Sequence, residues 1–211
     1  MFDLNVKDLC SGLFSDVMDK MGFRHQIILN MKRNNECVSF MGRAKTVLIE
    51  TYETKDENIR EGLGFLGTLS KGDVLVVKGS QEFAYFGELM TKLSTQMGIE
   101  GVVIDGLTRD TNYTHRPDVL LPIVAKGYSP VDIKGRGRVE NTNVKINVDG
   151  IDINPDDLIY ADNEAVCVVP REIEKEVIRR VKEKLEDEKR ITRLINSGIS
   201  VSELLEQVVE F

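Results

Sequence analysis

Apolar and polar residues alternate in blocks along the middle of the chain, and these blocks predict a strand, a helix and a second strand. Residues 74–77 form a continuous apolar run, which is typical of a strand buried on both faces. Four apolar residues then recur at the spacing of one helix face, namely Leu89, Met90, Leu93 and Met97. Gly98 suits the position after that helix, residues 101–104 are again apolar, and Asp105-Gly106 is typical of a turn. This order predicts a βαβ unit, whose parallel strands end at the same edge of a sheet.

Further elements are expected on both sides of this unit. The pattern indicates a helix near residues 9–21 and strands at 44–50, 144–148, 151–153, 158–161 and 166–169. Asp149-Gly150 between two of these strands is a hairpin signal. After Pro170, apolar residues recur every four positions among many charges, which predicts a long helix that Gly198 closes. Ser200 and Glu203 have the spacing of a capping box that opens a last helix.

Length and composition set limits on the function. With 211 residues, of which 41% are hydrophobic and 30% charged, we expect one ordinary globular domain at 1–170 and a C-terminal helical extension of it at 171–211. The formal net charge of −7 argues against a nucleic-acid partner, because phosphate binding requires a basic face. No apolar run approaches the length of about 20 residues that a membrane span needs, and the N-terminus lacks the layout of a signal peptide. We therefore expect a cytoplasmic protein with neither membrane nor nucleic-acid partners.

The cysteines narrow the kind of metal that the chain can hold. Cys10, Cys37 and Cys167 are odd in number and widely spaced, with neither a CxxC pair nor a clustered histidine. We expect them to be reduced, mostly buried thiols. Any bound metal should therefore be a hard ion that prefers oxygen ligands, and not a structural zinc.

Glu88 and the pair Arg109-Asp110 are separated by twenty residues, which is enough for one helix and one strand. In a βαβ unit the start of that helix and the end of that strand share one edge of the sheet. Free backbone amides after Gly87 could bind an anion there, Arg109 could hold a carboxylate or an enolate oxygen, and Asp110 could bind Mg²⁺. Taken singly, each feature has an ordinary alternative, which is a loop hinge at Gly87, a helix-dipole acid at Glu88 and a structural ion pair at Arg109-Asp110.

Other candidate residues favour structural roles. His25 and His115 stand alone, so surface or loop positions are expected for both. Lys78 ends a strand and could be a Schiff-base nucleophile, but nothing beside it in the sequence indicates a desolvated amine. The basic residues Lys134, Arg136 and Arg138 fit a solvated loop or a contact between subunits, and they are too few to indicate nucleic-acid binding.

Taken together, these residues resemble the RraA-like family, which includes 4-hydroxy-4-methyl-2-oxoglutarate aldolases and the ribonuclease E activity regulator, and whose members are often labelled demethylmenaquinone methyltransferase-like. The matching segments run almost from end to end, at residues 15–19, 42–47, 72–77, 87–89, 101–110, 129–137, 155–162 and 191–206. The aldolase branch has an acidic residue, twenty residues and then Arg-Asp, which Glu88 and Arg109-Asp110 satisfy. The chain departs from the family at residues 163–167, which could alter a strand or the edge of the pocket.

The resemblance implies a fold and a site. The fold would be α/β, a layered α-β-β-α sandwich of the swivelling β/β/α type with a C-terminal helical tail, assembled as a homotrimer or hexamer. Asp110 would bind a divalent cation, Mg²⁺ or Mn²⁺, directly, and Glu88 would bind it through water. Arg109 would contact the substrate's carbonyl or enolate oxygen, and a substrate carboxylate would lie on the backbone amides of four consecutive residues, Gly87, Glu88, Leu89 and Met90.

The resemblance also implies a reaction. The expected function is that of a class II pyruvate aldolase, a metal-dependent lyase that cleaves a 4-hydroxy-2-oxo acid and also decarboxylates oxaloacetate. Two alternatives stay open, which are a non-catalytic protein-binding regulator of RNA degradation and a lyase for a different oxo acid or sugar acid. The regulator branch lacks the intact Arg-Asp pair, so its presence here favours an enzyme.

Overall fold

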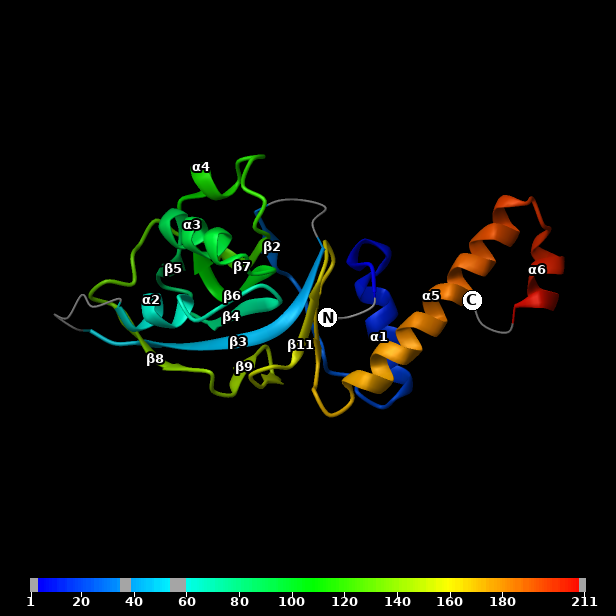
Figure 1. Ribbon diagram of the computed structural model, residues 1–211, viewed down its shortest axis with the longest axis horizontal. Helices are drawn as coiled ribbons and strands as arrows, with labels where there is room; N and C mark the ends of the chain where they lie inside the picture. Colours follow the sequence, from blue (N-terminus) through cyan, green and yellow to red (C-terminus); the bar gives the residue numbers. More distant parts are fainter. Residues whose placement is uncertain (1–3, 35–38, 54–59, 209–211) are drawn as a thin grey trace.

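The predicted βαβ unit lies at the centre of the fold in the computed structural model, which describes residues 4–34, 39–53 and 60–208 (Figure 1). β4 (Asp73–Lys78) and β6 (Gly101–Thr108) are parallel neighbours, and α3 (Glu88–Met97) lies between them in sequence. Gly98 ends α3 with φ 72°, the left-handed conformation that glycine adopts without strain. The two strands therefore end at one edge of the sheet, as predicted.

The remaining strands extend this unit into a curled sheet or, in the Asp149-Gly150 hairpin, form a separate two-stranded sheet. They are β1 (Ile27–Ile28), β2 (Lys32–Arg33), β3 (Phe40–Thr51), β5 (Ala84–Phe86), β7 (Ile123–Tyr128), β8 (Gly137–Thr142), β9 (Ile146–Val148), β10 (Ile151–Ile153), β11 (Leu158–Ala161) and β12 (Val166–Val169). The helices besides α3 are η1 (Val6–Asp8), α1 (Ser11–Lys20), α2 (Arg60–Leu66), α4 (Thr111–Thr114), α5 (Glu174–Asn196) and α6 (Val201–Gln207). The main path of the sheet is β1-β12-β11-β3-β4-β6-β7-β2, with β5 beside β6 and β8 beside β3.

Alternation along the strands divides the core into three layers. In β4, Val74 and Val76 face the inside of the curl, where the β9–β10 hairpin and the inner faces of β11 and β12 meet them. Leu75 and Val77 face outward and pack in the core layer that Leu66 of α2 and Met90 of α3 also join. On the opposite side, β11 and β12 turn Tyr160 and Cys167 toward the core residues of α1 and α5. The order of layers is thus helix, sheet, sheet and helix, so the predicted α/β sandwich is confirmed.

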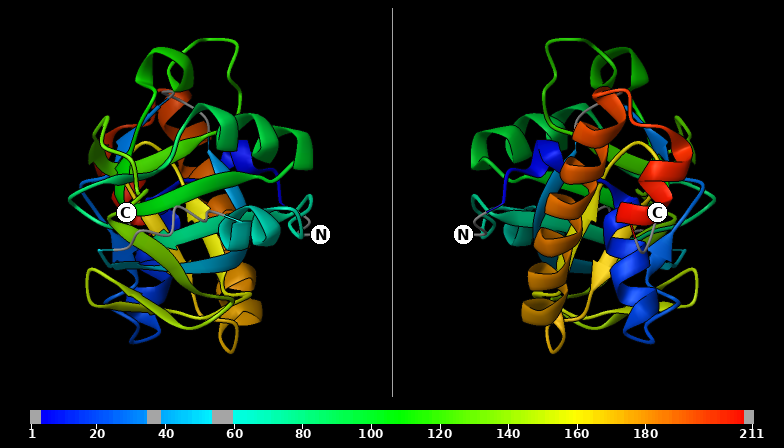
Figure 2. Two further views of the ribbon diagram at one scale, coloured as in Figure 1. Left: turned by 90° about the vertical axis from the view of Figure 1, so that its left-hand side faces the viewer. Right: turned by 90° about the vertical axis from the view of Figure 1, so that its right-hand side faces the viewer.

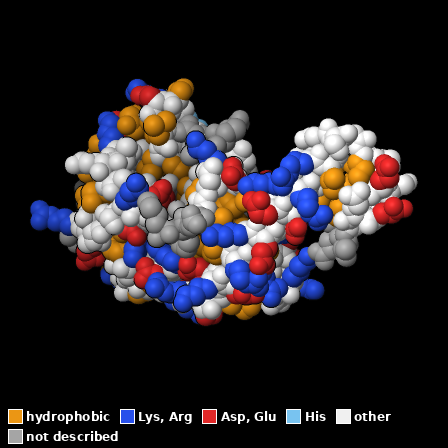
Figure 3. Space-filling view, turned by 45° about the vertical axis from the view of Figure 1, so that its right-hand side comes forward, with side chains coloured by type: hydrophobic (Ala, Val, Ile, Leu, Met, Phe, Trp, Pro, Cys, Tyr) orange, Lys and Arg blue, Asp and Glu red, His pale blue; other side chains and the backbone are white. Residues whose placement is uncertain are grey.

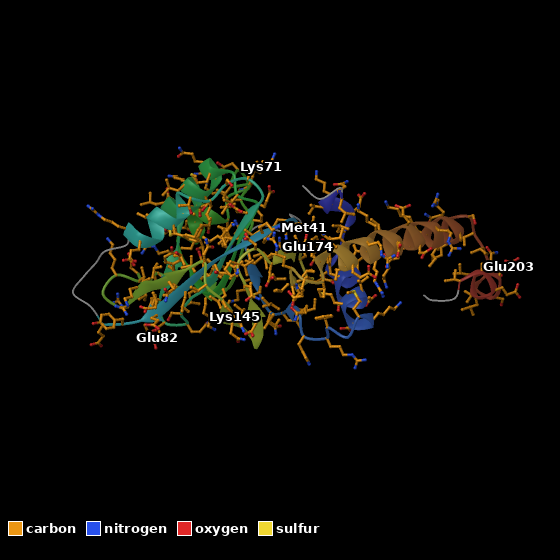
Figure 4. The ribbon with its side chains drawn as sticks, turned by 60° about the horizontal axis from the view of Figure 1, so that its bottom comes forward. Met41, Lys71, Glu82, Lys145, Glu174 and Glu203 are labelled. Carbon is orange, nitrogen blue, oxygen red and sulfur yellow. The ribbon has the colours of Figure 1, made fainter. Side chains whose placement is uncertain are left out.

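The helical tail begins against this sheet and then leaves it. Arg43 of β3 donates a hydrogen bond to Glu174 at 2.7 Å, which fixes the start of α5, and Val177 and Val181 are buried beside α1. Figure 2 shows α5 running along α1 and the outer strands, and Figure 4 shows Glu174 near the sheet and Glu203 at the far end of the tail. Ser200 and Glu203 form the predicted capping box of α6. The long helix begins at Glu174 and not directly after Pro170, because the intervening residues form a turn.

Two local predictions were wrong. Asp105-Gly106 is not a turn, because β6 continues to Thr108 and gains β5 as a partner there. Gly106 lets the residues that follow β4 pass close to β6, since a Cβ atom on it would lie 2.8 Å from the backbone of Ser80. In α3, the four apolar residues do not share a buried face, because Leu89 and Leu93 are 73% and 40% exposed. The predicted hairpin is confirmed, with both Asp149 and Gly150 at positive φ.

The surface carries both signs of charge. In Figure 3, Lys and Arg side chains are intermixed with Asp and Glu side chains over the visible face, which fits the ion pairs along α5.

Cys10 is exposed and Cys167 is buried, so only one of them fits the expected buried thiol, and Cys37 lies outside the described residues. Of the segment that departs from the family pattern, residues 163–165 form a bend before β12, and Val166 and Cys167 begin that strand. No helix in the described part of the chain is long and apolar enough to cross a membrane.

Candidate active site

The end of β6 and the start of α3 lie side by side because β5 joins them. β5 pairs in parallel with the extension of β6, with Phe86 opposite Thr108. The carbonyl of Phe86 accepts hydrogen bonds from the backbone N–H of Arg109 at 2.9 Å and from the hydroxyl of Thr108 at 2.7 Å. Gly87 and Arg109 follow directly on these two strands. The predicted edge thus brings the start of α3 against the Arg-Asp pair, and α3, α4 and β5 gather at that end of the sheet (Figure 1).

Asp110 binds the first amide of α3. Its Oδ2 atom accepts a hydrogen bond from the backbone N–H of Glu88 at 2.9 Å. Asp110 has φ 59°, a conformation that side-chain-bearing residues adopt at a cost of about 1 kcal/mol or more and that asparagine and aspartate tolerate best. A strained residue that aims a carboxylate into a pocket is typical of a functional site.

Gly87 makes room for this carboxylate. Its φ of −153° is an ordinary extended value, so its role is steric. A Cβ atom at this position would lie 2.3 Å from Oδ2 of Asp110 and 2.8 Å from Cγ of Arg109. The group that approaches the backbone at Gly87 is therefore the protein's own aspartate, and the expected binding of a substrate carboxylate by the neighbouring amides stays a prediction.

Arg109 lies between two carboxylates. Its Nη1 atom is 2.7 Å from Oδ2 of Asp132, and its Nε atom is 3.5 Å from Oδ2 of Asp110. The hydrogen bond to Asp132 raises the pKa of Arg109 further above its ordinary value. For Asp132, burial would raise the pKa, but the hydrogen bonds and positive charges of Arg109 and Lys134 together outweigh it, and the pKa falls below its usual value. The guanidinium, which is charged in any case, is thus held in place by a residue that the sequence did not single out.

Glu88 joins the same site from the first turn of α3. Its side chain forms an i,i+4 ion pair with Lys92 at 2.5 Å. This hydrogen bond raises the pKa of Lys92. Leu89 points into solvent and Met90 packs toward the core, so neither side chain lines the pocket. The role expected for the backbone amides of Leu89 and Met90 stays a prediction.

A pocket of about 640 Å³ opens in front of these groups. Its lining residues are Glu88, Arg109, Asp110, Thr111, Asn112, Tyr113, Arg116, Tyr128, Ser129 and Pro130. The polar groups Glu88, Arg109 and Asp110 form one wall. The other walls come from α4, with the residues that follow it, and from the end of β7, whose residues the sequence did not predict. The pocket is therefore open, polar and large enough for a small organic acid.

Residues after β6 form the outer wall of this pocket. Arg116 forms an ion pair with Asp118 at 2.7 Å, and its guanidinium carbon lies 5.6 Å from the centre of the Tyr113 ring. His115 closes α4, and its Nε2 atom is 3.1 Å from the hydroxyl of Tyr128. The wall is thus held by ion pairs and ring contacts. A helix of only four residues gives no periodic signal in the sequence, which is why this wall was missed.

The remaining candidate residues lie outside the pocket lining. Lys78 pairs with the buried carboxylate of Asp105, and His25 is exposed. Arg136 donates hydrogen bonds to backbone carbonyls of its own loop, and Arg138 pairs with Glu140 at 2.6 Å. These contacts agree with the structural roles expected for all four residues.

The donor set of the pocket fits a magnesium-like cation. Within the described ranges, no cluster of three or more His, Cys, Asp or Glu side chains could hold a metal ion. Two carboxylates, Asp110 and Glu88, line the pocket, and among the described residues no group donates a hydrogen bond to Oδ1 of Asp110. Mg²⁺ usually takes one or two carboxylates and keeps several waters, whereas a structural zinc site requires about four protein ligands. The site therefore suits a hard, partly hydrated ion.

Comparison with known proteins identifies the family. Residues 11–168 match the RraA-like family, whose description is Aldolase/RraA. The chain belongs to this family. A protein of Halalkalibacterium halodurans that carries the provisional name 4-hydroxy-4-methyl-2-oxoglutarate aldolase is 29% identical over 198 residues, which cover 92% of this chain and 89% of that protein.

Solved structures share the fold. An uncharacterized protein from Pseudomonas syringae pv. tomato superimposes with a TM-score of 0.83 at 25% identity, over 95% of this chain and 90% of its own. Streptomyces coelicolor RraAS2, described as an unusual member of the RNase ES inhibitor RraA protein family, gives a TM-score of 0.77 at 21% identity, over 89% of this chain and 93% of its own. RraA-like proteins thus include both named aldolases and an inhibitor family, so membership alone assigns no activity.

Proposed function

We propose that this protein is a divalent-metal-dependent lyase that cleaves a 4-hydroxy-2-oxo acid, such as 4-hydroxy-4-methyl-2-oxoglutarate, and releases pyruvate. The observation that carries the proposal is the packing of Asp110 and Arg109 against Gly87 in one open, polar pocket. This arrangement offers a carboxylate oxygen for Mg²⁺ or Mn²⁺ next to a fixed positive charge. The names given to relatives of the RraA-like family support the same reaction class.

The chain's own groups would act on a bound 2-oxo acid in three ways. A bound divalent cation, held by Asp110 directly and by Glu88 through water, would supply Lewis acidity. Arg109 would stabilise the negative charge that develops on the 2-oxo oxygen when the bond between C3 and C4 breaks. The amide of Glu88 already donates to Asp110, and the next amides of α3, those of Leu89 and Met90, would bind the substrate's carboxylate. Decarboxylation of oxaloacetate generates negative charge at the same oxygen, so we expect it as a second activity.

A coupled assay for pyruvate tests the proposal. The substrates would be oxaloacetate and a panel of 4-hydroxy-2-oxo acids, with Mg²⁺ or Mn²⁺ and then with a chelator. We expect metal-dependent pyruvate release, and a loss of about 100-fold or more in kcat for Arg109→Lys, which keeps the charge but loses the planar fork. Arg138→Lys is the matched control, because Arg138 lies outside the pocket lining.

The outcomes of this assay separate the alternatives. Pyruvate release from only one panel member would name the substrate, and release of another product would point to a different oxo-acid or sugar-acid lyase. No metal-dependent product from any substrate would contradict an enzyme and favour a protein-binding regulator, to be sought by pull-down of a ribonuclease. We also propose a homotrimer or hexamer in the cytoplasm, which light scattering and cell fractionation test.

A further inference from the structure

The guanidinium of Arg109 has two anionic partners, Asp110 and Asp132, and it lies nearer to Asp132. The distance from Nη1 to Asp132 is 2.7 Å, and the distance from Nε to Asp110 is 3.5 Å. The longer contact leaves Asp110 with one strong hydrogen bond, the one from the N–H of Glu88 to Oδ2. A guanidinium and a carboxylate prefer two parallel hydrogen bonds, which would use both oxygens of Asp110. Asp132 therefore competes directly with Asp110 for the guanidinium of Arg109.

The backbone fixes Asp132 independently of Arg109. Val131 accepts a hydrogen bond from the N–H of Ala84 at 2.8 Å, and Asp132 forms an isolated β-bridge with Ala84. Oδ1 of Asp132 accepts the N–H of Lys134 at 3.3 Å, which leaves Oδ2 for Arg109. The loop after β7 is thus attached to β5, the strand that leads into Gly87. The backbone of Asp132 is therefore fixed by contacts that do not involve Arg109.

We propose that Asp132 is a positioning residue, which holds Arg109 away from Asp110 and so keeps the second carboxylate oxygen of Asp110 available to a divalent cation. Without Asp132, Asp110 would be the nearest anion to Arg109, and the guanidinium would turn to bind both of its oxygens. An arginine bound in this way would compete with the cation. This proposal rests on the proposed function in one respect, which is that the divalent cation bound by Asp110 takes part in catalysis.

Binding of Mn²⁺ to purified protein, followed by electron paramagnetic resonance, tests this role without an activity assay. We expect Asp132→Asn to weaken Mn²⁺ binding by about tenfold, because a rotated Arg109 competes with the cation. In an Arg109→Met background the same Asp132→Asn change should alter binding less than about twofold, since no competitor remains. A loss of the same size in both backgrounds would overturn the proposal, because it would show that Asp132 acts through its charge alone.

A matched control and a crystallographic test separate this proposal from the proposed function. Asp152→Asn removes an aspartate from an exposed ion pair with Lys145 on the β9–β10 hairpin, and it should leave Mn²⁺ binding unchanged. Crystal structures of the metal-free wild type and Asp132→Asn should show Arg109 closing onto both oxygens of Asp110 in the variant. A guanidinium that keeps its wild-type place would refute the proposal. Absence of Mn²⁺ binding in the wild type would contradict the proposed function, while the crystal structures would still decide the role of Asp132.

Discussion

The backbone N–H of Glu88 donates a hydrogen bond to Oδ2 of Asp110 at 2.9 Å and so joins the start of α3 to the end of β6. The two residues lie 22 positions apart in the chain, and β5 brings them together by pairing with the extension of β6. A carboxylate on a helix N-terminus is stabilised by the free amides and the helix dipole. Asp110 is thereby held in a left-handed conformation in the lining of the pocket.

Asp110→Asn should remove metal-dependent activity while keeping the fold. The amide oxygen of asparagine can still accept the N–H of Glu88, and asparagine tolerates positive φ, but the negative charge is lost. We expect kcat to fall by about 100-fold or more, with an unchanged circular dichroism spectrum. Asp149→Asn is the matched control, because Asp149 also has positive φ and an ion pair but lies on the hairpin. Equal losses in both variants would show that the charge of Asp110 has no special role.

Gly87→Ala should damage the site by steric means. The added methyl group would lie 2.3 Å from Oδ2 of Asp110, so that either the aspartate or the start of α3 must move. We expect activity to fall by at least about tenfold and the melting temperature to decrease, because the displaced groups form the site.

Gly64→Ala is the control for this prediction. Gly64 lies in α2, and an added methyl group there has no atom within 4 Å. Alanine is favoured over glycine inside a helix by up to about 1 kcal/mol, so this variant should melt at the same or a higher temperature. A Gly87→Ala variant with full activity would show that Asp110 need not approach the backbone.

Much of this site could be predicted from the sequence, because the strands and the helix that carry it have local, periodic patterns of apolar residues. Apolar runs located β4 and β6, and parallel strands necessarily place Glu88 and Asp110 at one edge. Asp132 could not be found in this way, because it reaches Arg109 through a loop whose path depends on the bridge to Ala84. The exposure of Leu89 was also missed, since helical spacing shows that apolar residues share one face of a helix but not whether that face packs on the core.

The Arg109–Asp132 pair should make stability depend on pH in the acid range. The pKa of Asp132 is lower in the folded protein than in the unfolded chain, because the favourable contacts with Arg109 and Lys134 together outweigh the effect of burial. The folded state is therefore stabilised at pH values above the unfolded pKa of about 3.9, and this contribution is lost as the pH falls through the lower, folded pKa. For a partly exposed pair we expect about 0.5 kcal/mol.

Urea unfolding of the wild type and Asp132→Asn measures this contribution. The wild type should be more stable than the variant at neutral pH, and the difference should shrink at about pH 3 and below. A difference that is constant between neutral and acid pH would mean that ionisation of Asp132 does not stabilise the fold.

Arg116 should set the preference for the far end of the substrate. It lines the same pocket as Arg109 and Asp110, and its ion pair with Asp118 is exposed, so a substrate carboxylate can replace Asp118 at little cost. The contact of Arg116 with the Tyr113 ring keeps the guanidinium at the pocket wall. Arg116→Met should raise KM about tenfold for 4-hydroxy-2-oxo acids with a second carboxylate at the far end and leave kcat almost unchanged. For substrates with an uncharged far end, KM should change by less than about twofold.

The measurement is a comparison of both substrate types in the pyruvate assay, with Arg138→Met as the control. An equal rise in KM for both types would show that Arg116 does not recognise the second carboxylate.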